Sequence, residues 1–214
     1  MIWTLSLLFS LVAAAGFKGQ QERQIEGPSA DQVRVSNFTT AGNGCSQGTV
    51  GLTLSSDRTV LTFGFDGYTA HIGPSTSIKD RSKSCELNVN LTYPTEFQYS
   101  VTKTTYHGYA VLDRGLIGVM QAVYSFSSPL ENATTIAKVP GSVIDVFTIN
   151  VYVAETTRIW SPCGVNIPLL MRTRISLTSS ISGTGTYVFP GTMEDDSPGV
   201  HTWQTGISWR RCPV

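Results

Sequence analysis

Residues 61–72 decide the fold class, and they read Leu61-Thr62-Phe63-Gly64-Phe65-Asp66-Gly67-Tyr68-Thr69-Ala70-His71-Ile72. Before the Asp66-Gly67 dipeptide, large apolar side chains alternate with small or polar ones, which is the period of a strand with one buried face. Asp-Gly is a strong hairpin-turn signal, and a further strand-like run follows it. The stretch therefore predicts two strands joined by a tight turn.

The same alternation recurs along the chain, in residues 50–55, 87–92, 147–154 and 171–178. Two longer strands are expected between Phe97 and Phe126, with a turn at Asp113-Arg114-Gly115. One apolar and one polar face per strand is typical of antiparallel sheets packed on one side. The sequence predicts an all-β chain, with a single antiparallel β-sandwich or jelly-roll-like domain over residues 35–214.

The composition excludes several classes of protein. The 214 residues include 15 Lys and Arg against 15 Asp and Glu, and only 14% are charged, compared with about 25% in an average domain. The hydrophobic share of 41% can build a core, so the chain is not intrinsically disordered. Without a basic excess, no nucleic-acid partner is expected.

The N-terminus predicts export. An apolar run from Ile2 to Val12 precedes Ala13-Ala14-Ala15, which fits the small-x-small rule for cleavage. At about 15 residues the run is short of the roughly 20 needed to cross a bilayer, so a signal peptide over 1–15 is favoured over an anchor. No membrane span is expected elsewhere, and residues 16–34 are polar and aperiodic, which predicts a flexible arm.

The cysteines and the glycosylation sequons agree with an extracellular protein. Four cysteines can pair in three ways; we favour Cys45–Cys85 and Cys163–Cys212, which close loops of about 40 and about 50 residues. In the chain-entropy model each such bond stabilises by about 4 kcal/mol. N-glycosylation is predicted at Asn37, Asn90 and Asn132, which begin Asn-x-Thr sequons.

Signatures of catalysis and of metal binding are absent from the sequence, so no catalytic residue, cofactor or metal site is expected. The cysteines lack zinc-ligand spacing, and the three histidines are isolated. Glu194-Asp195-Asp196-Ser197 could hold calcium, although a solvated loop is the simpler interpretation. A polysaccharide hydrolase or lyase remains open, since two carboxylates need only the right separation in space; the residues to test are Glu86, Glu96, His107 and Asp145.

Aromatic side chains are the candidate ligand contacts. If residues 201–211 form a strand, Trp203 and Trp209 share a face with Thr205 and Ile207. Such a face could stack on sugar rings, but packing in the core is favoured, because large aromatics usually supply burial. The further candidates are Trp160, Tyr106, His107 and Tyr109, and for His107 a structural role is favoured. The arginines at 172, 174, 210 and 211 could form a basic patch.

The cysteines stand in a series of short motifs: Gly44-Cys45-Ser46-Gln47-Gly48, Ser84-Cys85-Glu86-Leu87, Tyr106-His107-Gly108-Tyr109, Trp160-Ser161-Pro162-Cys163 and Trp209-Arg210-Arg211-Cys212. Over about residues 33–212 this series resembles the secreted proteins grouped as domain of unknown function 4360, which are common in filamentous fungi. The resemblance implies a small secreted β protein with four structural cysteines. It carries no catalytic residue over to this chain.

These features predict a secreted, non-enzymatic β-sandwich protein that is monomeric and binds an extracellular partner. The partner would be a cell-wall polysaccharide or a host surface or apoplastic protein, which would make the chain an effector candidate. The alternatives are a polysaccharide-active hydrolase or lyase and a structural cell-wall protein. Joint exposure of Tyr106, Tyr109, Trp160 and Trp203 in one groove is the feature that would favour sugar binding.

Overall fold

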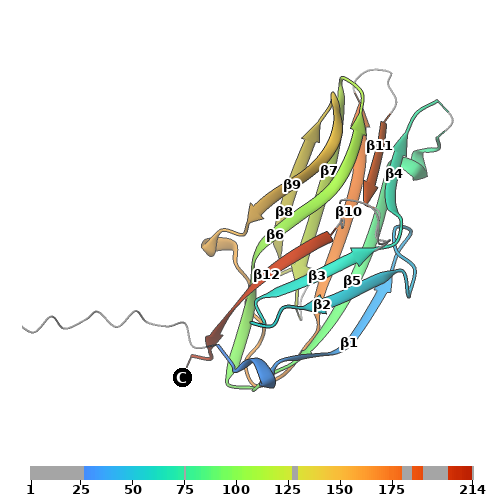
Figure 1. Cartoon of the computed structure of the whole chain (residues 1–214). Coiled ribbons are helices and arrows are strands. Elements are labelled where there is room, and N and C mark those ends of the chain that lie inside the picture. The colour runs from blue at the N-terminus through green and yellow to red at the C-terminus, as the bar shows by residue number, and fades with distance from the viewer. Residues whose placement is uncertain (1–26, 75, 127–129, 180–184, 190–201, 214) are drawn as a thin grey trace, which may run out of the picture.

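A computed structural model describes residues 27–74, 76–126, 130–179, 185–189 and 202–213 of the chain. It contains twelve strands in two antiparallel sheets, packed face to face as a sandwich (Figure 1). The strands are β1 Arg34–Ala41, β2 Val50–Leu54, β3 Val60–Phe65, β4 Tyr68–Ile72, β5 Ser82–Thr92, β6 Phe97–Leu112, β7 Leu116–Ser125, β8 Ala133–Pro140, β9 Val143–Tyr152, β10 Leu169–Ser179, β11 Gly185–Phe189 and β12 Thr202–Arg211. The predicted all-β sandwich is confirmed.

Helical structure in the described ranges is limited to three short 3-10 turns, Ala30–Gln32, Ile78–Arg81 and Glu155–Thr157. Within those ranges no helix has the length and hydropathy of a membrane span. The predicted signal peptide and residues 16–26 of the predicted arm lie outside the described residues. The last part of that arm is structured, because Val33 is buried and the Arg58 Nε donates to the Ala30 carbonyl at 2.8 Å.

One sheet, called sheet A here, has the order β1-β5-β10-β7-β8. The other, sheet B, has the order β2-β3-β12-β6-β11-β4, with β9 on the free side of β6. Strand β6 is long enough to pair with β12 along its first part and with β11 along its last four residues. The inner faces of both sheets form one core of buried residues.

The predicted turn at Asp113-Arg114-Gly115 joins β6 to β7. The Leu116 N–H donates to the Asp113 carbonyl at 3.1 Å, and Gly115 has a positive φ of 87°. This φ is readily available to glycine because it lacks a Cβ.

The prediction of a hairpin at Asp66-Gly67 is wrong. Strand β3 pairs with β2 and β12, whereas β4 pairs with β11. Since β12 and β11 both run antiparallel to β6, β3 and β4 run in the same direction, and the chain passes from one to the other without reversing. Asp66-Gly67 separates two strands that follow one another in the same direction. The two strands do not pair with each other because β12 is hydrogen-bonded to β3 and β11 is hydrogen-bonded to β4.

Candidate functional site

Both predicted disulfides are present, and they have different surroundings. Cys45–Cys85 joins the β1–β2 connection to β5 with a Cα–Cα distance of 5.4 Å, and both of its cysteines are buried. Cys163–Cys212 joins the segment before β10 to the end of β12 with a Cα–Cα distance of 5.8 Å; Cys163 is exposed. The pairing predicted from loop lengths is therefore confirmed for both bonds.

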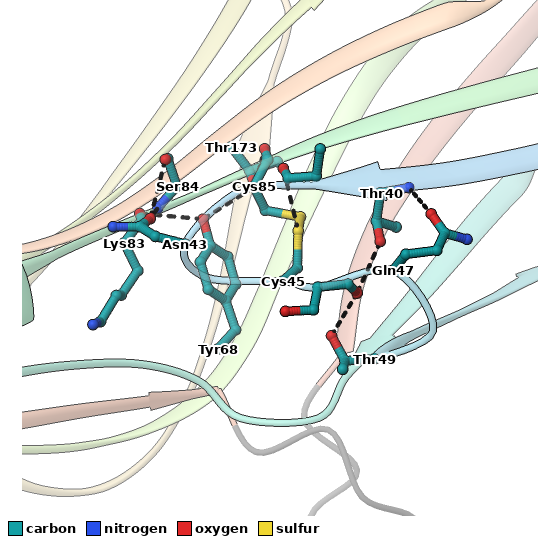
Figure 2. The surroundings of a disulfide bond; sticks show 12 residues. Thr40, Asn43, Cys45, Gln47, Thr49, Tyr68, Lys83, Ser84, Cys85 and Thr173 are labelled. Atoms are coloured by element: carbon teal, nitrogen blue, oxygen red, sulfur yellow. Dashed lines mark hydrogen bonds between the residues drawn. A yellow bond between two sulfur atoms is a disulfide. The ribbon is translucent and has the colours of Figure 1, made fainter.

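Figure 2 shows the first disulfide among hydrogen bonds that bind its loop to the sheet. The Ser84 N–H donates to the Asn43 Oδ1 at 2.7 Å, and the Thr40 N–H donates to the Gln47 Oε1 at 2.9 Å. The buried Tyr68 hydroxyl lies 3.1 Å from the Thr173 Oγ1. Burial raises the pKa of Tyr68, partly offset by that hydrogen bond. These contacts make the region a structural anchor.

The second disulfide forms part of the wall of a pocket of about 320 Å³. Trp160 and Ser161 line it from the segment before β10, Arg210 and Gln98 from β12 and β6, and Glu131 from the residues before β8. We call this the Trp160 pocket. Its lining combines an indole, a guanidinium, an amide and a carboxylate.

Ser161 fixes the segment that carries Trp160. Its buried Oγ accepts hydrogen bonds from the Tyr99 N–H at 3.0 Å and from the Tyr93 hydroxyl at 3.1 Å. Its own N–H donates to the Tyr99 carbonyl at 2.8 Å. Because these bonds attach the backbone next to Trp160 to β6, the indole is held in one place.

Arg210 fixes the indole itself. Its guanidinium carbon lies 3.7 Å from the centroid of the Trp160 ring, well within the range of a cation–π contact. The Gln98 amide, oriented so that both of its atoms are satisfied, accepts from the Arg210 Nε at 3.2 Å and donates to the Ser161 carbonyl at 3.1 Å. The half-buried Trp160 is thus a preorganised aromatic surface beside polar groups.

Three of the aromatic candidates lie in the core instead. Trp203 and Tyr106 are 0% exposed and Trp209 is 5% exposed. The Trp209 Nε1 donates to the Arg58 carbonyl at 2.8 Å, and the Tyr106 hydroxyl lies 2.7 Å from the Thr135 Oγ1. The face shared by Trp203 and Trp209 is therefore packing surface. The core packing favoured for Trp203 and Trp209 is therefore what the structure shows, and Tyr106, a candidate ligand contact, is buried as well.

His107 and Tyr109 are half-buried and lie on the outer face of sheet B, away from the Trp160 pocket. The His107 Nδ1 lies 2.6 Å from the Thr148 Oγ1 on β9. The structure therefore does not bring the six aromatic and histidine candidates together in one groove.

The four arginines do not form one patch. Arg172 and Arg174 lie on β10 of sheet A, where Arg172 forms an ion pair with Glu86 at 3.3 Å and Arg174 donates to the Ser82 Oγ. Arg210 and Arg211 end β12 of sheet B, and the Arg211 guanidinium lies 5.0 Å from the Phe97 ring centroid. Sheet pairing, which the sequence does not show, separates the two pairs.

The proposed catalytic residues are also dispersed. Glu86 is on the outer face of sheet A, His107 on the outer face of sheet B, Asp145 on β9, and Glu96 in the turn before β6. The described residues contain no cluster of three or more His, Cys, Asp or Glu side chains placed to hold a metal. The acidic run at 194–197 lies outside the described residues.

Sequence reasoning missed Gln98, Ser161 and Glu131 as pocket residues. None of them stands in a pattern of its own, since a glutamine within a strand, a serine two residues before a cysteine and an exposed glutamate are common. The Trp160-Ser161-Pro162-Cys163 motif was the available signal, because it places an aromatic three residues before a disulfide cysteine.

Residues 31–212 match the model of a domain of unknown function, DUF4360. An uncharacterized secreted protein of Arthroderma benhamiae is 34% identical over 186 residues, which are 86% of this chain and 74% of that protein.

Two solved structures share a distant likeness. One is TmCBM61 in complex with beta-1,4-galactotriose, with a TM-score of 0.26, 11% identity, and coverage of 86% of this chain and 94% of that one. The other comes from work on carbohydrate-binding modules of the beta-sandwich superfamily, with a TM-score of 0.28, 15% identity, and coverage of 78% and 60%. Scores this low carry no argument, whereas the family match spans almost the whole sandwich. The chain belongs to the DUF4360 family.

Proposed function

We propose that this protein is a secreted, non-enzymatic polysaccharide-binding protein that holds an extracellular sugar chain in the Trp160 pocket. The observation that carries the proposal is the half-buried Trp160 indole, which Arg210 holds at 3.7 Å beside a pocket of about 320 Å³. Ligand sites are typically concave, with aromatic walls and a few convergent polar groups.

The polar groups of the pocket suit a polyol. The exposed Arg210 guanidinium offers N–H donors and the exposed Glu131 carboxylate accepts, while the buried Gln98 amide positions Arg210. A sugar ring presents C–H groups on its face and hydroxyls on its rim, which match an indole surface and a rim of donors and acceptors. Because the Trp160 side chain is already fixed, little side-chain entropy is lost on binding.

Export is part of the proposal. The N-terminal apolar run, the two disulfides and the Asn-x-Thr sequons fit an oxidising extracellular compartment. The relative from Arthroderma benhamiae is described as secreted, which agrees with this location.

Binding without catalysis is preferred to hydrolysis or lyase activity. Acid–base chemistry on a glycosidic bond needs two groups facing one site, whereas Glu86 and His107 lie on opposite outer faces of the sandwich. Glu86 is also engaged by Arg172.

The test is a pull-down of the secreted mature protein on insoluble chitin, β-glucan, cellulose, mannan and pectin, with released sugars assayed in the supernatant. We expect retention of the wild type that survives added salt, because stacking depends little on ionic strength. Trp160→Ala and Arg210→Ala should each lower the affinity at least tenfold. Arg172→Ala, which removes an exposed arginine from sheet A, is the matched control and should bind like the wild type.

Two outcomes contradict the proposal. Sugar released by the wild type would favour the enzyme alternative. An absence of retention on every polymer would exclude polysaccharide and direct the search to a protein partner.

A further inference from the structure

The outer face of sheet B carries a row of polar residues that runs straight across five strands. In register, Thr53 on β2 pairs with Thr62 on β3, which pairs with Gln204 on β12; Gln204 pairs with Thr105 on β6, and Thr105 with Asn150 on β9. With strands about 4.8 Å apart, the row spans roughly 19 Å. We call it the polar row. All five side chains are hydroxyls or amides, so the row is uncharged.

Part of the polar row is preorganised. The Thr105 hydroxyl donates to the Asn150 Oδ1 at 2.7 Å, which leaves the amide N–H₂ of Asn150 as a donor. Thr53 and Asn150 are exposed at the two ends, Thr62 and Gln204 are half-buried, and Thr105 is buried. The row therefore presents both donors and acceptors to a molecule that lies on it.

A glycine pair lies beside the polar row. Gly51 on β2 pairs directly with Gly64 on β3, and at each position a Cβ would have no atom within 4 Å. Glycine within a strand costs roughly 0.5–1 kcal/mol relative to alanine, and neither position has a positive φ or a close neighbour that requires it. Two paired strand glycines with open space above them would allow a ligand to approach the backbone closely.

Aromatic side chains flank the other end of the polar row. Tyr152 is 72% exposed and pairs with Lys103, whose Nζ lies 5.9 Å from the centroid of its ring. On the opposite side of the row, the half-buried Tyr109 lies beyond His107 on β6. The outer face of sheet B therefore has tyrosine rings near the β9 end of the polar row, and the open space above Gly51 and Gly64, called the glycine floor here, near the β2 end.

The outer face of sheet A has the opposite character. It carries the Glu86–Arg172 ion pair, and Asn37 pairs in register with Asn90 across β1 and β5, which places two predicted glycosylation sites together. The third sequon, at Asn132, directly precedes β8 of the same sheet. Glycans at these positions would cover sheet A and leave the polar row open.

We propose that the polar row and the glycine floor bind an uncharged, extended polysaccharide chain laid across β2, β3, β12, β6 and β9. The proposal rests on the proposed function, and it adds a second contact surface and the class of ligand. The uncharged row selects a neutral polymer, because an acidic polymer would leave its carboxylates without partners along most of the row.

The polar row and the Trp160 pocket both lie on the outer face of sheet B, where β12 contributes a residue to each. Gln204 and Arg210 are an even number of residues apart, so both face outward from the sheet, while Trp203 and Trp209 face the core. The two sites can therefore engage the same insoluble polymer, and their affinities would then reinforce one another.

The experiment is affinity electrophoresis in native gels that contain a soluble neutral polymer, either laminarin, galactan, xyloglucan or galactomannan, with polygalacturonate as the acidic polymer. Gly51→Leu and Gly64→Leu place a side chain in open space, so the fold should tolerate them while the glycine floor is blocked. Thr178→Leu, an exposed position on the outer face of sheet A, is the matched control. Gln204→Ala removes one member of the row without adding bulk.

We expect retardation of the wild type by at least one neutral polymer, a loss of tenfold or more in affinity for each glycine variant, and a smaller loss for Gln204→Ala. Thr178→Leu should migrate like the wild type. If the glycine variants bind as the wild type does while Trp160→Ala does not, the polar row is not a binding surface and the proposed function stands. Binding only to polygalacturonate overturns the choice of a neutral ligand. If no polymer retards the wild type, both proposals fail.

Discussion

The two disulfide regions contain the same bond and differ in what surrounds it. Around Cys45–Cys85 the cysteines are buried and the side-chain hydrogen bonds attach a loop to sheet A. Around Cys163–Cys212 one cysteine is exposed, and the hydrogen bonds of Ser161 and Gln98 hold Trp160 over a pocket. The first disulfide thus stabilises the fold alone, whereas the second also forms part of the wall of the pocket proposed to bind a sugar.

The sharpest test of this comparison removes each bond in turn. Replacing Cys45 and Cys85 by alanine should lower the free energy of unfolding by about 4 kcal/mol from loop entropy, and by more because two buried side chains are lost. Replacing Cys163 and Cys212 by alanine should lower the free energy of unfolding by about 4 kcal/mol, and it should also weaken polysaccharide binding. Urea unfolding measures the first quantity and the pull-down the second. The comparison fails if the Cys45–Cys85 variant loses more binding than the other when both are folded.

A glycine in each loop extends the test. At Gly44 an added Cβ would overlap the Tyr68 ring, which is itself buried. We expect Gly44→Ala to cost about 1–3 kcal/mol through overpacking. At Gly164, next to Cys163, the space is open but φ is +78°, so Gly164→Ala should cost only about 1–2 kcal/mol of backbone strain. Thermal unfolding of the two variants shows which substitution lowers the stability more. A larger loss of stability for Gly164→Ala than for Gly44→Ala would contradict the view that the first region is the more tightly packed.

Alkaline pH should separate two tyrosines, one from each region. Burial raises the pKa of Tyr68 beside the first disulfide, and less strongly that of Tyr93, which donates to Ser161. The unfolded chain ionises near pH 10 while the folded chain does not, so this stability is complete below pH 10 and is lost as pH rises towards the folded pKa. Each such tyrosine should lower the free energy of unfolding by about 1.4 kcal/mol per pH unit above 10, until the folded pKa is reached.

The measurement is urea unfolding at several pH values from 8 to 11.5. Tyr68→Phe should flatten the alkaline loss more than Tyr93→Phe, because the pKa of Tyr68 is raised further. Equal slopes for the wild type and Tyr68→Phe would contradict this assignment.

The smallest expected effect comes from the same two hydroxyls at neutral pH. Tyr68→Phe removes a contact with Thr173, and Tyr93→Phe removes a bond to Ser161. Each should lower the free energy of unfolding by about 1 kcal/mol. Only Tyr93→Phe should also weaken polysaccharide binding, because Ser161 positions the segment of Trp160. A loss of binding in Tyr68→Phe of the same size would show that both regions support the site.

The fold class and the strand periodicity could be predicted from the sequence, which also favoured the observed disulfide pairing. Alternation of apolar and polar residues is a local property, and it fixes which face of each strand is buried. The short loops closed by Cys45–Cys85 and Cys163–Cys212 favoured the observed pairing among three. The burial of Trp203 and Trp209 on one face followed from the same period.

How the strands pair is set by tertiary packing, and the pocket and the polar row depend on that pairing. Asp66-Gly67 has the local chemistry of a hairpin, but β11 and β12 take the edges of β4 and β3, so the chain continues without reversing. The polar row joins residues as far apart in sequence as Thr53 and Gln204, and the Trp160 pocket joins Gln98 to Arg210. Contacts between strands distant in sequence are set by the packing of the whole core, and no local pattern encodes them.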